Sequence, residues 1–457
     1  MATLRAALDR LYQRRRFGLR PGLDVVRALL GALDHPERTF PAIHVTGSKG
    51  KGSVAAMAEA ILSASGLKTG LFTSPHLQSF RERIRIGREP IPPDALVVGL
   101  DRVEHAAAEL ERTGAIDRAP TFFEVTTAVA FDWFRRESVD AAVVEVGIGG
   151  RLDSTNVLAG PVGVVTTVEL EHTDLLGPTR AAIAREKAGI LHAGMHAIAG
   201  ALPDEARTEV DRVAREVGAP IWHLDTEIRV GDRTLSPRGQ TFDVELPTRR
   251  LARLRLPLLG TFQPGNAALA VAAVDRFAHA TGRPVPDRAV RRGLANVRWR
   301  GRVERVARRP DLYVDAAHTP DSAVALAQSL AEVAPFAAPE GNVVLFGCLA
   351  EKRLAPMLDA LAPLAHTVVL VPVPSDRAAP VEEMRRVALG RFRRIVVAPD
   401  VARGLSVARA ATAADGLTVA AGSDYLVGAI LDVLEGSPAD EPDLSDPGRA
   451  PPPRSAP

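Results

Sequence analysis

The chain has 457 residues, more than one hydrophobic core usually organises, so we expect two domains. Hydrophobic residues make up 46% and charged residues 25%, which excludes a disordered protein. The 57 basic and 55 acidic residues give a net charge of +2, which excludes an overall basic surface for nucleic acid. The single cysteine, Cys348, excludes an intramolecular disulfide and a cysteine zinc cluster.

The first 22 residues predict an amphipathic helix with arginines and Asp9, without the apolar run of a secretory signal. No stretch is apolar and long enough to cross a bilayer. We therefore expect a cytoplasmic monomer that acts on small molecules, with neither nucleic acid nor membrane as partner.

Four short apolar runs in the first half of the chain are separated by helical patterns. They are residues 42–47, 69–75, 141–147 and 162–168. Runs that are apolar on both faces predict strands of a parallel sheet covered by helices on each side. The expected fold class is therefore α/β, with a doubly wound parallel-sheet domain at the N-terminus; the loop described below makes this domain P-loop ATPase-type.

Between Thr226 and Leu259 the pattern changes to alternating polar and apolar residues. Turn signals at Gly231-Asp232 and at Pro237-Arg238-Gly239 predict a small antiparallel sheet there. A helix is expected to follow from Asn266.

After Arg302 the alternation of strands and helices resumes. Five apolar runs, at residues 311–317, 342–349, 366–373, 394–399 and 417–423, predict a second, Rossmann-like α/β domain. We expect the domains to span residues 1–295 and 296–437. The proline-rich residues 438–457 have a composition that cannot bury a core, so we expect a disordered tail.

A glycine-rich turn between an apolar strand and a helix predicts a phosphate-binding loop. Its residues are Gly47, Ser48, Lys49, Gly50, Lys51, Gly52 and Ser53. Backbone N–H groups and the helix dipole would face an anion, Lys51 would reach the outer phosphates, and Ser53 would bind Mg²⁺. The loop departs from G-x-x-x-x-G-K-[ST], and an ordinary glycine-rich turn is the structural alternative.

Several long motifs occur in the order typical of one enzyme family. Besides the loop they are TSPHL at 73–77, FRERI at 80–84, TFFE at 121–124, EVGIGGRLD at 145–153, TN at 155–156, HTD at 172–174, LGP at 176–178 and REKAGI at 185–190. The chain thus resembles the dihydrofolate synthase/folylpolyglutamate synthase family of the Mur ligase superfamily, over residues 16–431. In that family the loop typically reads GTNGKGS.

Some positions depart from the family's pattern. Lys49 stands for asparagine, Glu171 for the aspartate before the histidine, and Ala316 and Thr319 change DGAHNP to DAAHTP. Residues 350–353 read AEKR where the family often has an Asp-Lys-Asp run.

The resemblance implies an ATP-dependent ligase that adds L-glutamate to dihydropteroate, reduced folates or both through an acyl-phosphate. It implies ATP and Mg²⁺ as cofactors and Mur ligase architecture as the fold. Joining an amine to a carboxylate in water is uphill, and γ-phosphoryl transfer needs positive charge around the phosphates rather than a covalent protein group.

The resemblance also assigns site residues. For ATP they are the loop residues, Gln263, Asn266, Arg302 and Asp315. For magnesium they are Ser53, Ser74, Glu145, His172 and Lys187 as a carbamate, and for glutamate His318 and Ser423. The catalytic set is Lys51, Lys187, His172 and His318.

Each assignment has a structural alternative. Ser74 would cap a turn, Glu145 would pair with Arg151, His172 would hold a loop, and Lys187 would be an exposed lysine paired with an acid. The functional reading gains support because Ser74, Glu145 and His172 all follow predicted strands, where ligands of open α/β sheets bind.

Two other functions remain open at this point. One is a different Mur-type ligase, acting on a cell-wall nucleotide or a polyglutamate chain. The Arg16-Phe17-Gly18 segment and the TSPHL and TFFE motifs favour the folate branch over this alternative. The other is a nucleotide-binding switch that has lost ligation.

Overall fold

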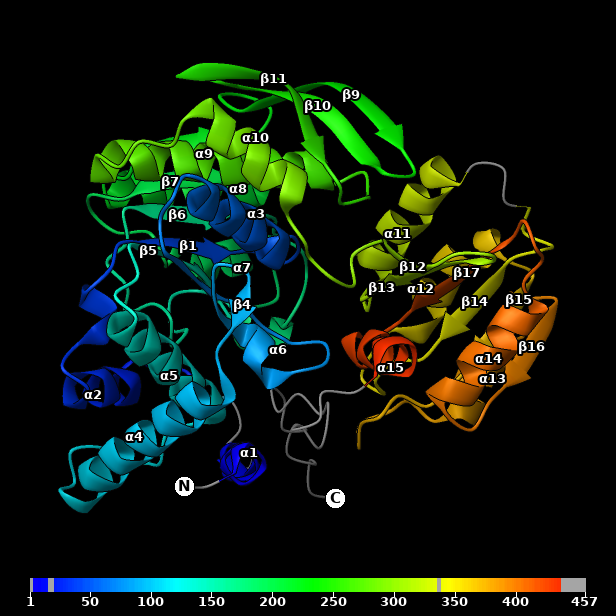
Figure 1. Cartoon of the computed structure of the whole chain (residues 1–457), viewed down its shortest axis with the longest axis horizontal. Helices are drawn as coiled ribbons and strands as arrows, with labels where there is room; N and C mark the ends of the chain where they lie inside the picture. Colours follow the sequence, from blue (N-terminus) through cyan, green and yellow to red (C-terminus); the bar gives the residue numbers. More distant parts are fainter. Residues whose placement is uncertain (1–2, 15–19, 335–337, 437–457) are drawn as a thin grey trace.

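Two mainly parallel β-sheets form the centres of two lobes that lie side by side in the computed structural model (Figure 1). The structure describes residues 3–14, 20–334 and 338–436. The predicted tail, residues 438–457, and the Arg16-Phe17-Gly18 segment lie outside the described residues.

The N-terminal sheet has eight strands in the order β4-β3-β2-β5-β1-β6-β7-β8. They are β1 (Ala42–Thr46), β2 (Thr69–Phe72), β3 (Ile84–Ile86), β4 (Glu89–Pro90), β5 (Ala141–Glu145), β6 (Val162–Val165), β7 (His196–Ala199) and β8 (Ile221–His223). In this order, each pair of neighbouring strands from β2 through β5, β1, β6 and β7 to β8 is parallel. Strands β3 and β4 extend the sheet beyond β2 in antiparallel pairing. The four predicted apolar runs correspond to β1, β2, β5 and β6, which confirms the parallel sheet.

Helices cover both faces of this sheet (Figure 1). They are α1 (Leu4–Gln13), α2 (Asp24–Ala32), η2 (Pro36–Arg38), α3 (Lys51–Ala64), η3 (Phe80–Arg83), α4 (Pro93–Arg112), α5 (Phe122–Arg136), α6 (Thr173–Leu176), α7 (Arg180–Ala188), α8 (Asp204–Glu216), α9 (Gln263–Thr281) and α10 (Asp287–Asn296). The predicted amphipathic helix at the N-terminus is α1, which buries Leu4, Ala7, Leu8 and Leu11, the spacing of one helical face.

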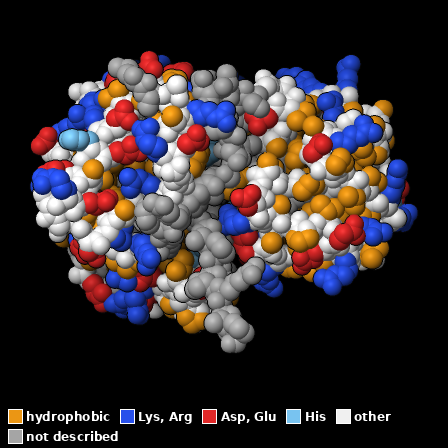
Figure 2. Space-filling model, turned by 90° about the horizontal axis from the view of Figure 1, so that it is seen from below, with side chains coloured by type: hydrophobic (Ala, Val, Ile, Leu, Met, Phe, Trp, Pro, Cys, Tyr) orange, Lys and Arg blue, Asp and Glu red, His pale blue; other side chains and the backbone are white. Residues whose placement is uncertain are grey.

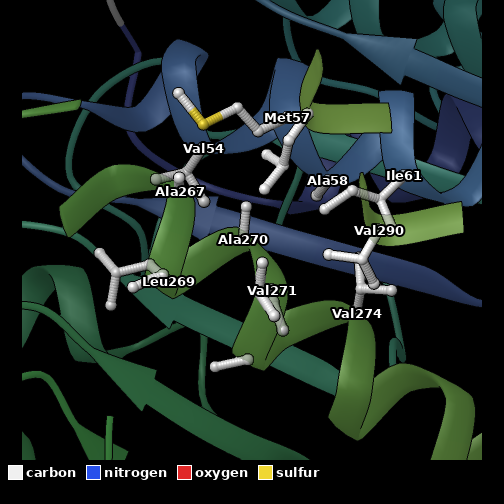
Figure 3. Packing of buried hydrophobic residues seen from close by; sticks show 14 of the residues in the cluster. Val54, Met57, Ala58, Ile61, Ala267, Leu269, Ala270, Val271, Val274 and Val290 are labelled. Atoms are coloured by element: carbon white, nitrogen blue, oxygen red, sulfur yellow. The ribbon is translucent and has the colours of Figure 1, made fainter. Parts of the chain in front are cut away.

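Helix α3 packs closely against both α9 and α10 beside the sheet (Figure 3). In this cluster Val54 of α3 lies beside Ala267 of α9, and Ile61 of α3 lies toward Val290 of α10. Helix α9 is rich in small apolar residues and is buried on most of its surface, as expected for a helix that is apolar nearly all round. This packing fixes the beginnings of α3 and α9, which carry the phosphate loop and Asn266.

Gly293→Ala should lower the midpoint of thermal unfolding, because α10 crosses α3 at this glycine. A Cβ there would lie 2.6 Å from Ile61 Cα and 2.7 Å from Ala60 O, which are backbone atoms that cannot move separately. We expect a loss of about 1–3 kcal/mol from overpacking, more than the gain in helix propensity. The control is Gly31→Ala in α2, where the nearest atom is 3.7 Å away. Equal midpoints for the two variants would contradict the close crossing.

The small antiparallel sheet has the order β11-β10-β9 and lies at the top of the N-terminal lobe in Figure 1. Its strands are β9 (Arg229–Ser236), β10 (Gly239–Leu246) and β11 (Arg249–Leu256). The turn predicted at Pro237-Arg238-Gly239 joins β9 to β10. The turn predicted at Gly231-Asp232 is wrong: both residues lie within β9, where Asp232 has a φ of 47° beside an irregularity in register with β10. A bulge uses the same residue types as a turn.

The C-terminal sheet has six strands in the order β12-β13-β17-β14-β15-β16. Its elements are β12 (Glu304–Ala307), β13 (Asp311–Asp315), α11 (Pro320–Val333), β14 (Val343–Phe346), α12 (Leu354–Leu361), η4 (Ala362–Leu364), β15 (Thr367–Leu370), α13 (Val381–Ala388), β16 (Arg394–Val397), α14 (Val401–Ala411), β17 (Leu417–Ala421) and α15 (Asp424–Glu435). The five predicted runs correspond to the five parallel strands, and β12 adds an antiparallel edge. We propose a domain boundary at residue 296, since α10 ends at Asn296.

Basic and acidic side chains are interspersed over the face shown in Figure 2, in agreement with the small net charge. On the same face, hydrophobic side chains gather over the C-terminal lobe (Figure 2). Within the described residues, no helix combines the length and apolarity that a membrane crossing requires.

Candidate active site

A cavity of about 690 Å³ lies between the two lobes. The N-terminal lobe lines it with the phosphate loop and with residues that follow β2, β5 and β6. The C-terminal lobe contributes residues that follow β13 and β17. Both sets come from the carboxyl ends of parallel strands, where open α/β sheets bind ligands.

The phosphate loop runs from the end of β1 into α3, and its backbone is held by the end of β6. The N–H groups of Ser48 and Lys49 donate to Thr167 O and Thr167 Oγ1, each at 2.8 Å, and Thr166 Oγ1 donates to Lys49 O. Gly47 has a φ of 146°, and a Cβ at this position would lie 1.9 Å from Thr166 Oγ1. Glycine is therefore required at position 47 by both backbone conformation and space.

Lys51 and Gly52 begin α3 just after Gly50, whose φ of 82° turns the chain into the helix. Lys51 Nζ donates to Gly47 O at 3.0 Å, so the lysine folds back over its own loop. A Cβ at Gly52 would lie 2.5 Å from Trp299 Cζ2. The indole of Trp299, from the segment between α10 and β12, thus packs directly on the phosphate loop.

Gln263 and Asn266 pack against the same loop from the start of α9. Asn266 lines the cavity, and a Cβ added at Gly50 would lie only 2.6 Å from Asn266 Oδ1. Gln263 is fully buried. Its Nε2 donates to Ser53 Oγ at 3.4 Å, and its Oε1 accepts from Asn266 Nδ2 at 3.2 Å. Gln263 therefore lies behind Asn266, where it orients the loop serine and the asparagine.

Glu145 ends β5 and is buried beside the loop. Its Oε2 accepts from the N–H of Ser74 at 3.0 Å. Burial raises the pKa of Glu145, while the charge of Lys51 and the hydrogen bond from Ser74 oppose that rise. The alternative pairing with Arg151 does not occur, because Arg151 Nη2 pairs with Glu186 at 2.9 Å.

Lys187 projects from α7 into the cavity, and its residue is only 1% exposed. Its Nζ donates to Glu171 Oε1 at 3.0 Å. Burial lowers the pKa of Lys187 to about 8 against the opposing charge of Glu171, and Lys51 lowers it further. Burial disfavours the ionised form of Glu171, yet the charges of Lys187, Lys51 and Lys49 outweigh this and hold its pKa well below the usual range. Lys187 is thus paired with an acid, as in the structural alternative, but it is not exposed.

His172 lines the cavity directly after Glu171, with a left-handed φ of 49° at the start of α6. Within the described chain, no cluster of three or more His, Cys, Asp or Glu side chains is placed to hold a metal ion. The cavity wall also holds the hydroxyl groups of Ser53 and Ser74 and the carboxylate of Glu145, which are oxygen groups of the kind that Mg²⁺ prefers.

In the C-terminal lobe, Asp315 at the end of β13 accepts from the N–H groups of Val303 and Ala317 at 2.8 and 2.7 Å. Burial raises the pKa of Asp315 to about 6, against the charge of Arg302. Both carboxylate oxygens of Asp315 thereby tie the segment between the domains to the turn before α11. Arg302 lines the cavity, with Nη1 3.7 Å from Asp424 Oδ1.

His318 and Ser423 also line the cavity. The ring Nδ1 of His318 lies 2.8 Å from Ala316 O and 3.8 Å from Asp424 Oδ2. Enclosure in the cleft and the charges of Lys49 and Lys352 lower the pKa of His318 well below its usual value. Ser423 Oγ accepts from the N–H of Tyr425 at 3.1 Å and caps α15, so this hydroxyl has a structural task as well.

Asp424, Arg83 and His76 are among the cavity residues that sequence reasoning did not assign to the site. Asp424 lies between Arg302 and His318, and only its position after β17 could have indicated it. Arg83 is 2% exposed, packs over Phe80 and Phe122, and donates from Nε to His76 Nδ1 at 2.9 Å. His76 and Arg83 both lie in motifs that carry the family resemblance, which was the available signal.

Two domain families match the chain: the Mur ligase middle domain at residues 45–274 and the Mur ligase glutamate ligase domain at residues 301–423. Folylpolyglutamate synthase of Lacticaseibacillus casei is 39% identical over 369 residues, which cover 80% of this chain and 85% of that protein. The dihydrofolate synthase/folylpolyglutamate synthase of Mycobacterium tuberculosis is 37% identical over 392 residues, with coverages of 81% and 78%. This chain belongs to the folylpolyglutamate synthase family of Mur ligases.

Solved structures of the family share the fold over nearly the whole chain. Mycobacterium tuberculosis folylpolyglutamate synthase in complex with ADP and AMPPCP is similar with a TM-score of 0.85 and 35% identity, covering 91% of this chain and 96% of that one. A folylpolyglutamate synthase–AMPPCP–folate complex has a TM-score of 0.81 and 35% identity, with coverages of 94% and 99%. The predicted family and fold class are confirmed.

Within this Mur ligase, the middle domain supplies the phosphate loop, Glu145 and Lys187 to the cavity. The glutamate ligase domain supplies Asp315 and His318 from the opposite wall. The cavity is therefore the meeting place of the two Mur ligase domains.

Proposed function

We propose that this chain is an ATP-dependent ligase that adds L-glutamate to dihydropteroate, reduced folates or both. The observation that carries the proposal is one cavity with a phosphate loop on one wall and His318 with Ser423 on the other. Relatives named folylpolyglutamate synthase and dihydrofolate synthase support the substrates, and family structures with ADP, AMPPCP and folate support the ligands.

The reaction has two steps in this proposal. An oxygen of the acceptor carboxylate bonds to the γ-phosphorus of ATP, the bond to the β-γ bridging oxygen breaks, and ADP leaves. The neutral amine of glutamate then attacks the acyl carbon, and phosphate leaves with the electrons of the C–O bond. The nitrogen gives one proton to water and keeps one N–H in the amide. Lys51 and the N–H groups at the start of α3 bind the phosphates, and Arg302 adds charge from the segment between the domains. Asn266 and Asp315 complete the nucleotide site.

Magnesium is part of the proposal. Ser53, Ser74 and Glu145 offer the oxygen atoms that Mg²⁺ prefers, with His172 and the modified Lys187 as further ligands. Bound Mg²⁺ would neutralise phosphate charge and orient the acceptor carboxylate. The buried carboxylate of Glu145, whose pKa burial raises, fits a site that receives positive charge.

Lys187 is proposed to carry a carbamate formed with carbon dioxide. Only a neutral amine reacts in this way, and a pKa lowered to about 8 leaves a usable neutral fraction near neutral pH. The carbamate places two oxygens where metals favour anions, whereas an ammonium would repel them.

His318 and Ser423 are proposed to hold the incoming glutamate. Both follow strands of the glutamate ligase domain, and the cations Arg302 and Lys352 near His318 favour a dicarboxylate. Closure of the two domains would exclude water, which otherwise hydrolyses an acyl-phosphate. We further propose that the protein acts as a cytoplasmic monomer.

The proposal predicts amide formation that requires all three substrates. Purified protein with Mg²⁺, ATP and radiolabelled glutamate should form labelled product with dihydropteroate, with tetrahydrofolate or with both. ADP release should depend on the acceptor. ADP release that ignores acceptor and glutamate would favour a nucleotide switch, and inactivity with every pterin but activity with another carboxylate would favour a different Mur-type ligase.

A further inference from the structure

Two leucines of the N-terminal domain pack into the C-terminal domain. Leu77, in the TSPHL motif, is 9% exposed and belongs to an apolar cluster whose other members all come from the C-terminal domain. Leu259, just before α9, is 5% exposed and belongs to a second cluster of that domain. The successive residues Leu312 and Tyr313 of β13 belong to different clusters, so the clusters lie on opposite faces of the C-terminal sheet. The two leucines therefore contact the domain from both faces of its sheet.

The first contact, which we call the Leu77 contact, joins the TSPHL segment to α15. A Cβ added at Gly301 would lie 3.1 Å from Leu77 Cδ1 and 3.2 Å from Val427 Cγ1, so these three residues meet. Beside them, Gln78 Nε2 donates to Asp432 Oδ1 at 3.0 Å. Val427 and Asp432 both belong to α15, which lies on the side of the C-terminal lobe that faces the N-terminal lobe (Figure 1).

The backbone that carries Leu77 is held by one carboxylate. Glu82 accepts hydrogen bonds from the N–H groups of Leu77, Gln78 and Ser79 at 3.0, 3.0 and 2.9 Å. The same carboxylate forms part of the capping box of η3. The position of Leu77 is therefore fixed relative to the N-terminal domain.

The second contact, which we call the Leu259 contact, joins the small sheet to α11. Arg233 Nη2 of β9 pairs with Glu332 Oε2 of α11 at 2.7 Å. Arg233 Nε donates to Gln240 Oε1 at 2.9 Å, and Gln240 Nε2 donates to the carbonyl groups on either side of Leu259 at 2.9 and 2.8 Å. These hydrogen bonds fix Leu259 to the small sheet, and the ion pair fixes the sheet to α11.

The chain passes between the domains once, and the crossing is short. Trp299 packs on Gly52 of the phosphate loop, whereas the carbonyl of Gly301 accepts from the N–H of Ala316 in the C-terminal domain at 3.0 Å. Gly301 has a φ of 67°, a conformation that glycine adopts without strain. Hinges between domains are a few residues that absorb backbone rotation. The peptide units between Trp299 and Gly301 are placed to be such a hinge.

We propose that Leu77 and Leu259 are positioning residues whose contacts define the axis about which the two domains turn, while the chain bends next to Gly301. This inference rests on the domain closure of the proposed function. Rotation about this axis changes the distance between the phosphate loop and His318 on opposite walls of the cavity. It separates neither leucine from its apolar cluster, so closure does not expose the apolar surface that these contacts bury.

A crosslink beside Leu77 tests one end of the axis. In Gln78→Cys/Asp432→Cys, a short bis-methanethiosulfonate reagent joins the two domains, and a thiol reductant releases them. The native Cys348 is buried and should not react. On addition of AMPPCP, Mg²⁺ and folate, small-angle X-ray scattering should show the same decrease in radius of gyration for crosslinked and reduced protein. Turnover of the two forms should agree within about twofold.

Two further crosslinks complete the experiment. Arg233→Cys/Glu332→Cys joins the domains beside Leu259 and should also keep the decrease in radius of gyration. Glu169→Cys/Asp321→Cys is the control, because these residues line the cavity from opposite domains and lie away from both contacts. Its crosslinked form should lose the decrease, and reduction should restore it. Mass spectrometry measures the crosslinked fraction in each case.

Three outcomes would overturn the axis. The first is an unchanged radius of gyration in the wild type, since the domains would then not turn. The second is a decrease that either contact crosslink abolishes and reduction restores, because that contact would have to open. The third is a decrease that survives in the crosslinked cavity pair. Scattering does not require ligation, so the assay with labelled glutamate can fail while the axis stands.

Substitution of Leu77 tests the residue itself. Leu77→Ala should loosen the contact and raise the ADP released per amide formed at least about tenfold, because an imperfectly closed site admits water to the acyl-phosphate. Leu77→Met should restore the wild-type ratio. Leu405→Ala, in the same apolar cluster but in α14, should lower stability without changing this ratio. Equal ratios in Leu77→Ala and Leu405→Ala would overturn the positioning role, whereas a wild type that forms no amide would overturn the proposed function.

Discussion

Lys51→Ala should lower the rate of ligation by on the order of 10³-fold while the protein stays folded. The lysine begins α3 at the phosphate loop and donates only from its flexible end to Gly47 O. We expect its charge to offset the negative charge that develops during phosphoryl transfer. The side chain lies in the cavity wall rather than in the apolar cluster beneath α3.

Turnover with saturating ATP and circular dichroism separate the two effects. Lys68→Ala is the matched control, because Lys68 pairs with Glu137 at 2.9 Å on the surface with 43% of its side chain exposed. We expect this variant to keep activity within about twofold of wild type, as is usual for an exposed ion pair. Near-normal turnover of folded Lys51→Ala would remove the phosphate-loop assignment.

Lys187→Ala should lose at least about 10²-fold in turnover and regain part of it when acetate or propionate is added. The substitution removes the group that would carry the carbamate and leaves a space beside Glu171, into which a small carboxylate can bring the missing oxygens. Loss of a buried charge from the Glu171 pair also costs stability, so unfolding must be followed in parallel.

Lys187→Met is the control for this rescue. Methionine fills most of the space left by the lysine without supplying oxygen, so added carboxylates should not restore its turnover. Crystals grown with bicarbonate should show density beyond the lysine nitrogen in the wild type. A plain amine in such crystals, together with full activity of Lys187→Ala, would contradict the carbamate.

The central parts of the fold were predictable because they depend on local patterns. Buried parallel strands such as β1 and β5 are short, mainly apolar runs, a pattern typical of a sheet that is covered on both faces. The strand β12 was not predicted, because its sequence Glu304–Ala307 is partly exposed at every position and pairs only at an edge. Gly231-Asp232 was assigned to a turn because a bulge becomes visible only when the partner strand is known.

In the candidate site, too, continuous segments were predictable and contacts between separate elements were not. The loop from Gly47 to Ser53 is one continuous segment, so its residues and spacing could be read directly. The burial of Lys187 and its contact with Glu171 depend on how α7 packs beside the end of β6, which spacing alone does not specify. Gln263 illustrates the limit for single residues, because only packing shows that it supports Asn266 from behind.

Trp299 gives the chain an internal optical signal at the phosphate loop. The protein has three tryptophans. Trp133 is buried among the N-terminal helices, and Trp222 stacks under Arg276 at 4.1 Å. The indole of Trp299 instead rests on Gly52, between the loop and the segment that joins the domains. Its emission therefore depends on the polarity and mobility of the loop, which makes nucleotide binding and domain movement readable without an added dye.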